Sequence, residues 1–199
     1  GNFLSAFCIM STINLLPAQR EFIELPDSLN HGDKDVCIYQ GGVGSGKTFV
    51  GALLGVLLCL RFPGIIGLVG AYTFTLLRDT TLDMYFKHLD SFGIKYTFNK
   101  QESNLYFSNG SKIYFRHFDD PECFKSLNVG FIEMEECSQI PQSVFDDLHA
   151  RLRQEIRPEW GDRFIYRMFG HTNPQGPKGW IYEYFVKRPK KNYRRVFAP

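Results

Sequence analysis

The chain has 199 residues, a hydrophobic content of 44% and a formal net charge of only +2. Such a length fits one large domain or two small ones, and it suffices to bury a sizeable core. No run of about 18 apolar residues occurs, which excludes an ordinary membrane-spanning helix. The cysteines show no C-x-x-C spacing, and Cys37 and Cys59 lie in apolar runs, which favours reduced, buried thiols in a cytoplasmic protein.

The N-terminal part divides into two pieces. The first nine residues differ from the rest, whereas Met10 would make a natural start. We therefore expect residues 1–9 to be a leader, added by an expression vector or left by processing. Residues 17–25 then predict a short helix with Pro17 at its first position.

A glycine-rich segment follows, between an apolar run at 36–40 that is typical of a buried strand and a Leu-, Ala- and Val-rich helix at 49–60. It matches the phosphate-binding pattern G-x-x-x-x-G-K-[ST] and reads Gly41, Gly42, Val43, Gly44, Ser45, Gly46, Lys47 and Thr48. The glycines allow backbone N–H groups to surround a phosphate chain, and the positive end of the following helix faces the same phosphates. We expect Lys47 to reach the β- and γ-phosphates of ATP and Thr48 to ligate Mg²⁺.

The rest of the chain alternates between strand and helix patterns. In chain order we predict a buried strand at 64–71, a helix at 75–89, three short strands at 94–98, 104–107 and 112–115 with an Asn109-Gly110 turn, a strand at 129–134, a helix at 142–153 and a strand at 164–169. This alternation predicts an α/β fold with a mostly parallel central sheet, helices on both faces and an antiparallel β insertion at its edge.

Adjacent carboxylates close the strand at 129–134. We expect this strand beside the P-loop strand, with its carboxyl end facing the γ-phosphate. Successive strand residues point in opposite directions, so we assign Glu135 to Mg²⁺ and Glu136 to polarising the attacking water. Glu133 lies two positions earlier on the same side as Glu135, and it remains either the metal-side acid or an outward-facing charge.

Two further polar features could serve a nucleotide. Thr172 and Asn173 follow the last predicted strand and could hydrogen-bond the γ-phosphate or the attacking water, although Asn-Pro is also a common turn signal. The Gln19 amide offers both a donor and an acceptor to the edge of adenine, as any exposed helical glutamine would.

In this order, the motifs resemble the ATPase domain of the large terminase subunit of tailed bacteriophages, the motor that pumps DNA into a procapsid. The resemblance runs from about residue 15 to 185. It comprises an adenine-recognising glutamine motif at 15–22, a Walker A motif at 41–48, a Walker B motif with its catalytic glutamate at 131–141 and a coupling motif at 170–174. The resemblance implies a RecA-like P-loop NTPase fold of the additional-strand class and an Mg²⁺-dependent ATPase. It also implies double-stranded viral DNA, a portal protein and a terminase small subunit as partners, a homo-oligomeric ring, and a place on the procapsid in the host cytoplasm.

The sequence departs from the family pattern at two cations. Many terminases carry an arginine where this chain has Val43, and others carry one eleven residues before the catalytic glutamate, where this chain has Lys125. Lysine is a point charge without the bidentate fork of arginine. We favour Lys125 as the cation that acts on a neighbouring subunit, with Arg116 as the nearest rival and Arg151 and Arg153 as others.

Six lysines and arginines crowd into nine residues near the C-terminal end, Lys187, Arg188, Lys190, Lys191, Arg194 and Arg195. We expect an ATPase domain at residues 10–186 and a basic segment at 187–199 that leads toward a nuclease domain, so nuclease activity is not expected here. A solvated linker is the alternative to a segment that contacts a polyanion.

Three functions compete. The leading prediction is an ATP-hydrolysing motor domain that drives double-stranded DNA into a procapsid. The first alternative is a helicase-like or other additional-strand ATPase acting on nucleic acid. The second is a nucleotide-gated assembly protein with negligible turnover.

Overall fold

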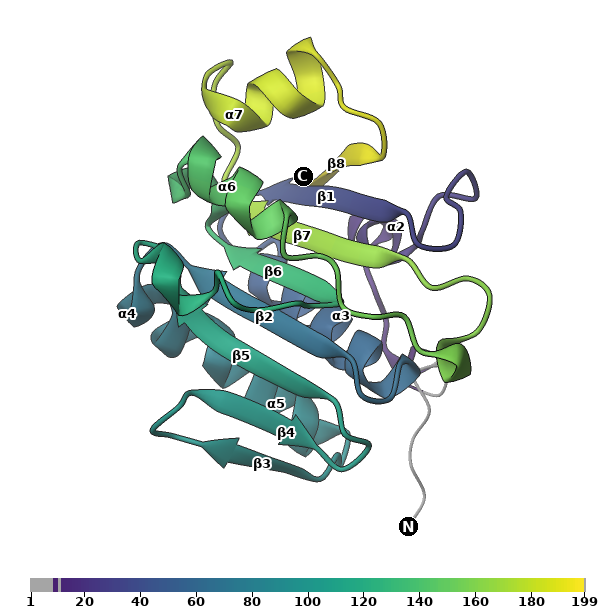
Figure 1. Ribbon diagram of the computed structural model, residues 1–199. Coiled ribbons are helices and arrows are strands. Elements are labelled where there is room, and N and C mark those ends of the chain that lie inside the picture. The colour runs from purple at the N-terminus through teal and green to yellow at the C-terminus, as the bar shows by residue number, and fades with distance from the viewer. Residues whose placement is uncertain (1–8, 11, 199) are drawn as a thin grey trace.

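A computed structural model describes residues 9, 10 and 12–198. Its centre is an eight-stranded sheet of order β3-β4-β5-β2-β6-β7-β1-β8 (Figure 1). The strands are β1 (Lys34–Gly41), β2 (Ile66–Ala71), β3 (Tyr96–Asn99), β4 (Asn104–Phe107), β5 (Lys112–His117), β6 (Phe131–Glu135), β7 (Tyr166–Thr172) and β8 (Tyr193–Ala198). The main helices are α2 (Pro17–Ile23), α3 (Lys47–Arg61), α4 (Phe74–Leu76), α5 (Asp83–Ser91), α6 (Gln142–His149) and α7 (Gly179–Tyr182).

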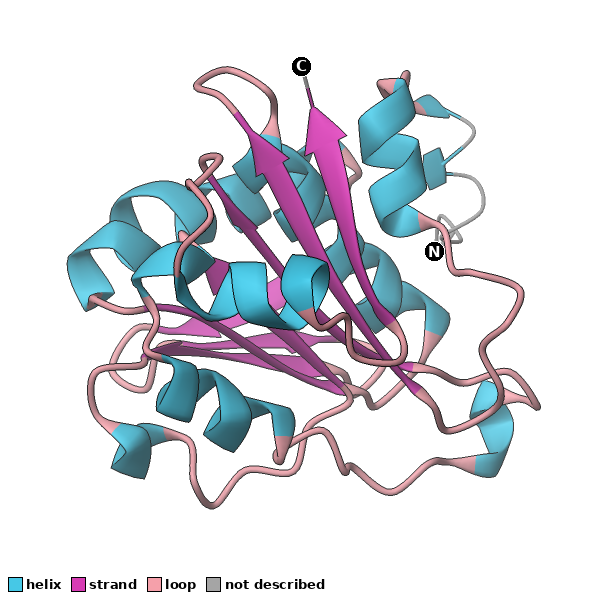
Figure 2. Ribbon diagram, turned by 90° about the horizontal axis from the view of Figure 1, so that it is seen from above, coloured by secondary structure: helices cyan, strands magenta, loops and turns pink. Residues whose placement is uncertain are grey.

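Six neighbouring strands, from β5 to β8, run parallel to one another. Their carboxyl ends therefore meet at one edge of the sheet, where the P-loop follows β1. Helices α2, α3 and α5 cover one face, while α6 and α7 lie on the other (Figures 1 and 2). The α/β fold class, the mostly parallel sheet and the helices on both faces are confirmed.

The antiparallel insertion is also confirmed. β3 pairs with β4, and β4 with β5, both antiparallel, at one edge of the sheet. The predicted turn connects β4 to β5, where Gly110 adopts φ +84°, a left-handed conformation that favours glycine. Asn109 supports this turn because its side-chain oxygen accepts a hydrogen bond from the Ser111 amide.

The position of β6 corrects one prediction. We expected the acidic strand beside the P-loop strand, but β7 lies between them and pairs with both. Consequently the polar end of β7 lies between the P-loop and the carboxylates. Sequence periodicity does not encode strand order, which depends on contacts between distant segments.

The basic C-terminal segment contains a strand that the sequence analysis did not predict. β8 pairs in parallel with β1 at the other edge of the sheet. Arg194 on β8 donates from Nε to Asp35 Oδ1 at 2.9 Å, and its guanidinium also bonds the backbone carbonyls of Phe22 and Glu24. This arginine therefore fastens α2 and β8 together and is not available as a solvated charge.

Two predicted helices differ in detail. The expected helix at 142–153 ends at His149, because the chain turns back and Leu152 forms an isolated parallel bridge with Val129. The expected helix at 75–89 is present, but a π-helical turn, η1 (Leu77–Leu82), separates α4 from α5.

The predicted leader lies almost wholly outside the described residues. Ile9 is described, and it is buried together with Leu15, Leu53 and Leu57. Within the described part of the chain, no helix is long and apolar enough to cross a membrane.

Candidate nucleotide-binding site

The P-loop connects β1 to α3 with the geometry that a phosphate site requires. Gly44 and Gly46 have φ angles of +83° and +74°, so both positions favour glycine. Lys47 Nζ donates to the carbonyl oxygens of Gly41 and Gly42 at 2.9 Å each and to Asn173 Oδ1 at 3.0 Å. The predicted coupling residue Asn173 thus contacts the P-loop lysine directly. Val43 is 98% exposed at the tip of the loop.

Glu135, at the end of β6, is buried and faces Thr48. Its Oε2 atom lies 3.4 Å from Thr48 Oγ1 and accepts a hydrogen bond from Thr81 Oγ1 at 2.5 Å. Its Oε1 atom lies 3.4 Å from His171 Nδ1. These contacts fix both carboxylate oxygens beside the first helical turn after the P-loop.

Glu133 lies on the same side of β6 and is fully buried, so it is not an outward-facing charge. Tyr85 donates to its Oε2 at 2.6 Å, and His171 Nε2 lies 3.3 Å from its Oε1. No contact joins it to Thr48 among the described residues, in contrast to Glu135. Burial raises the pKa of the Glu133 carboxyl, although the hydrogen bonds from His171 and Tyr85 oppose that shift.

His171 on β7 connects the two buried acids. Burial by itself would lower the pKa of the imidazole, but the neighbouring Glu135 and Glu133 outweigh burial and raise it. A protonated imidazole can donate from both ring nitrogens, one toward each carboxylate. In its protonated form His171 would compensate the negative charge of an ionised carboxylate beside it.

Glu136 follows β6 in a strained conformation and belongs to a different environment. Its φ of 44° and ψ of 53° place it in the left-handed region, which glutamate rarely adopts. It is half-buried. Thr172 Oγ1 donates to its Oε2 at 3.2 Å and lies 2.7 Å from Ser138 Oγ. The bend directs Glu136 away from the pair of buried acids and toward the end of β7.

The oxygens of Thr48 and Glu135 suit Mg²⁺, which prefers oxygen ligands and binds proteins through one or two carboxylates together with substrate phosphates. The described residues contain no group of three or more His, Cys, Asp or Glu side chains able to hold a metal ion. The protein therefore offers a partial ligand set that the phosphates of a nucleotide would complete.

A cavity of about 320 Å³ lies beside the P-loop between α2 and β8. Its lining residues are Leu16, Pro17, Ala18, Glu21, Tyr39, Ser45, Phe197 and Ala198. Leu16 and Phe197 are 56% and 54% exposed, which is unusual for large apolar side chains. Ser45 Oγ is buried without a hydrogen-bond partner. A flat, apolar ring with polar edges fits this combination.

Gln19 is not among the side chains that line this cavity. It is buried, its Oε1 accepts from the Leu16 amide at 3.0 Å, and its Nε2 would lie 2.5 Å from a Cβ placed on Gly46. Gln19 thus packs on the P-loop backbone, and its oxygen already has a donor.

The candidate cations differ sharply in freedom. Lys125 is exposed, and its one ion pair within the described part of the chain is with the exposed Glu122, at 2.9 Å. Arg116 is half-buried, and it bonds Glu102 O and Asn104 Oδ1 across the hairpin, as expected for a structural arginine. Arg151 and Arg153 connect the segment after α6 to the loop before β6. Arg151 donates to the Lys125 carbonyl, and Arg153 Nε donates to Asn128 Oδ1 at 2.7 Å.

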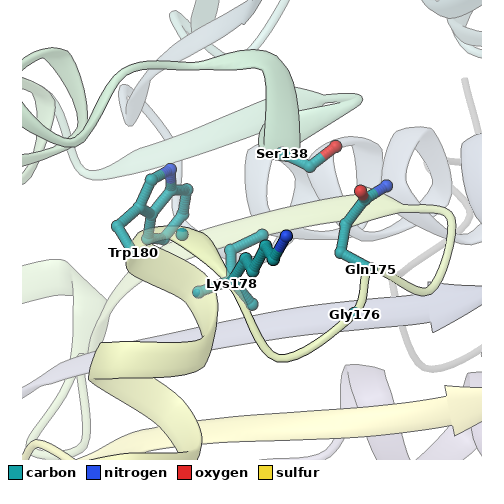
Figure 3. A pocket seen from close by; sticks show the side chains of 7 residues that line it. Ser138, Gln175, Gly176, Lys178 and Trp180 are labelled. Atoms are coloured by element: carbon teal, nitrogen blue, oxygen red, sulfur yellow. The ribbon is translucent and has the colours of Figure 1, made fainter.

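Several residues at this edge escaped the sequence analysis. Thr81 and Tyr85 belong to no motif, and His171 lies within the coupling motif but received no role; their buried contacts with β6 identify all three. Lys178 lines a cavity of about 280 Å³ with Ser138 and Gln175, just beyond the coupling motif (Figure 3). A free lysine after an Asn-Pro turn gives no signal in a single sequence.

Comparison with known proteins adds independent information. A sequence profile of the phage terminase large subunit matches residues 33–197. The PBSX phage terminase large subunit of Bacillus subtilis (strain 168) is 33% identical over 154 residues, which cover 76% of this chain and 34% of that protein. The chain therefore spans about a third of the length of this relative.

Solved structures agree on the fold. The large terminase of a thermophilic bacteriophage in complex with ADP matches with a TM-score of 0.75 at 17% identity, over 92% of this chain and 45% of that one. The large terminase ATPase domain of Thermus phage P74-26 matches with a TM-score of 0.61 at 15% identity, over 93% and 81%. At these identities the likeness concerns the fold alone.

Proposed function

This chain belongs to the phage terminase large subunit family, and from that premise we propose that it is the ATP-hydrolysing motor domain that drives viral double-stranded DNA into the procapsid. The observation that carries the proposal is the convergence of three adjacent strand ends. The P-loop follows β1, Thr172 ends β7 and Asn173 follows it, and Glu135 ends β6 and Glu136 follows it. Each strand end offers a group that an ATPase needs. The ADP complex of the large terminase from the thermophilic bacteriophage supports nucleotide binding in this fold.

The chain's residues would divide the chemistry as follows. Backbone N–H groups of the P-loop and Lys47 would bind the phosphates, and Thr48 and Glu135 would hold Mg²⁺, which would neutralise phosphate charge. Glu136 accepts a proton from the attacking water. Asn173, whose Oδ1 accepts a hydrogen bond from Lys47, would instead donate from Nδ2 to the γ-phosphate and so report its presence to β7.

We assign the adenine base to the cavity between α2 and β8, with Leu16 on one side and Phe197 on the other. Aromatic and aliphatic faces bind a flat base without reading its identity. The unpartnered Ser45 hydroxyl lies close to this cavity and could bond the ribose or the base. Gln19 would support the P-loop backbone that borders the cavity, since its amide nitrogen lies beside Gly46.

Turnover should depend on assembly, because the hydrogen bonds and ion pairs that Lys125, Arg116, Arg151 and Arg153 make among the described residues all lie outside the P-loop. We expect low ATP turnover by the isolated chain, rising steeply with protein concentration and further on procapsids with portal protein, small subunit and double-stranded DNA in the host cytoplasm. Steady-state phosphate release measured against protein concentration tests this. High turnover by a monomer independent of concentration would contradict the ring. Stimulation of turnover by single-stranded DNA alone would favour a helicase-like ATPase. If assembled rings showed no ATP turnover, the result would favour a nucleotide-gated assembly protein.

Lys125 is the proposed cation in trans. It follows a short 3₁₀ turn, Pro121–Cys123, beyond the end of β5, which is four strands or about 19 Å from β1. That distance favours action on a neighbour over action on its own P-loop. Cations supplied in this way contribute about 10³–10⁵ in rate.

A mixing experiment measures that contribution. Lys125→Ala subunits retain their P-loop, and Lys47→Ala subunits retain Lys125, so each is inactive alone while mixed rings should regain ATP turnover. A parallel series mixes Arg116→Ala subunits with Lys47→Ala subunits. Recovery in the Arg116→Ala mixtures and none with Lys125→Ala would transfer the role to Arg116.

A further inference from the structure

The buried acids of β6 are held by hydroxyl groups from a single helix. Thr81 donates to Glu135, and Tyr85 donates to Glu133. The donors are four residues apart on a helix, which corresponds to about 6 Å, and the acceptors are two residues apart on a strand, which corresponds to about 6.6 Å. The two spacings match, so the helix and the strand form a two-rung ladder of hydrogen bonds.

The neighbouring helix α3 leaves room for this ladder. A methyl group on Gly51 would overlap Glu133 and His171, and one on Gly55 would overlap the Tyr85 hydroxyl. Glycine within a helix costs stability relative to alanine. Gly51 and Gly55, four residues apart on α3, leave the space that the side chains of Glu133, His171 and Tyr85 occupy.

Helix geometry explains how Thr81 reaches the site. Thr81 lies in the π-helical turn η1, and such turns frequently occur at functional sites. The neighbouring Thr80 points outward, and its hydroxyl bonds the Leu76 carbonyl at 2.7 Å. Thr81 is fully buried beside Glu135, and its hydroxyl lies 3.5 Å from that of Thr80.

A buried carboxylate needs donors, because removal from water without compensation is costly. Besides Thr81, the polar partners of Glu135 within the described residues are Thr48 and His171, at 3.4 Å each. Thr81 makes the shortest of the three contacts. It therefore has the largest influence on the direction of this carboxylate.

We propose that Thr81 is the positioning residue for Mg²⁺: its hydroxyl holds Glu135 in the orientation that meets the cation beside Thr48. This inference rests on the proposed role of Glu135 in nucleotide binding. It also assigns a task to the π-helical turn, which connects the metal site to α5 and, through the stacking of Phe86 on Tyr96, to the antiparallel insertion.

The test is the Mg²⁺ dependence of ATP-γ-S affinity, measured by titration calorimetry with the 199-residue chain. In Thr81→Val, which keeps the shape and removes the donor, affinity without Mg²⁺ should stay within about twofold of wild type. The Mg²⁺ concentration for half of the affinity gain should rise about 10-fold, as loss of a hydrogen bond to a charged group implies. Glu135→Gln should show the same kind of loss.

Two matched variants separate orientation from packing. Thr81→Ser retains the hydroxyl and should restore the wild-type Mg²⁺ response, and Thr97→Val, the same change at an exposed position on the edge strand β3, should leave it unaltered. If Thr81→Val fails to fold, Thr81→Ala gives the same readout. A wild-type response in the variants that lack the hydroxyl, or no rescue by serine, would overturn the role of Thr81 alone. A wild-type protein whose affinity ignores Mg²⁺ would overturn the metal assignment of Glu135, and the role of Thr81 with it.

Discussion

Replacement of Lys47 by alanine should abolish productive ATP use. Lys47 carries the only positive side chain within the P-loop, and its Nζ is already directed to the centre of the loop by the carbonyls of Gly41 and Gly42. A phosphate chain that enters the loop would replace these carbonyls with charged oxygens, so the amine loses little freedom on binding. Without the amine, both ground-state affinity and stabilisation of the transferred phosphoryl group are lost.

Nucleotide affinity and steady-state turnover should therefore fall together in Lys47→Ala. Lys87→Ala is a matched control, because Lys87 is an exposed lysine on α5 that pairs with Asp83 at 2.7 Å, away from the P-loop. The control should retain wild-type affinity and turnover. Unchanged turnover in Lys47→Ala would refute the assignment of residues 41–48 as a phosphate site.

Much of the fold could be predicted because the local signals were strong. The P-loop pattern, the Asn109-Gly110 turn and the alternation of apolar runs depend on neighbours in the sequence, and most elements formed close to where they were expected, although the helix expected at 142–153 ends at His149. β8 was missed because its arginines indicated a solvated segment. Arg194 is partly buried, and Asp35, 159 residues away in the sequence, accepts hydrogen bonds from its guanidinium. Such a partner cannot be found from periodicity.

The site was predicted less completely than the fold, for a related reason. The motif residues Lys47, Thr48 and Asn173 come together. The hydrogen bond from Lys47 to Asn173 connects the P-loop directly to the predicted coupling motif. The roles of Glu133 and Glu135 could not be separated by alternation along β6, which places both on one side. Their difference depends on which partners each meets, and those partners come from α3, α5 and β7.

Backbone conformation, not alternation along a strand, distinguishes Glu136 from the buried acids. Sequence reasoning placed Glu135 and Glu136 on opposite sides of one strand. In the structure β6 ends at Glu135, and the left-handed bend at the next residue turns its carboxylate toward Thr172. Backbone strain of this kind costs about 1–3 kcal/mol and clusters at functional sites. The strain is consistent with a carboxylate that must face a water molecule instead of a metal ion.

Glu136→Gln should therefore separate binding from hydrolysis. Glutamine has the same length, tolerates the same backbone angles about as well, and retains an oxygen that can accept from Thr172. The change removes the charge that would accept a proton, so hydrolysis should fall by about 10²–10⁴. Affinities for ADP and ATP-γ-S and the Mg²⁺ dependence should remain close to wild type, since Thr48 and Glu135 are untouched.

Single-turnover hydrolysis and equilibrium binding, measured on the same preparation, check both parts of this expectation. Glu159→Gln is the control, because this exposed glutamate precedes β7 at the amino edge of the sheet, far from the P-loop. A loss of Mg²⁺ dependence in Glu136→Gln would exchange the roles of Glu135 and Glu136. Unimpaired hydrolysis would require another base, and Thr172 could not supply it because a hydroxyl without a neighbouring carboxylate is too weak a base at neutral pH. The bend at Glu136 would then have no catalytic purpose, so the assignment depends on this one measurement.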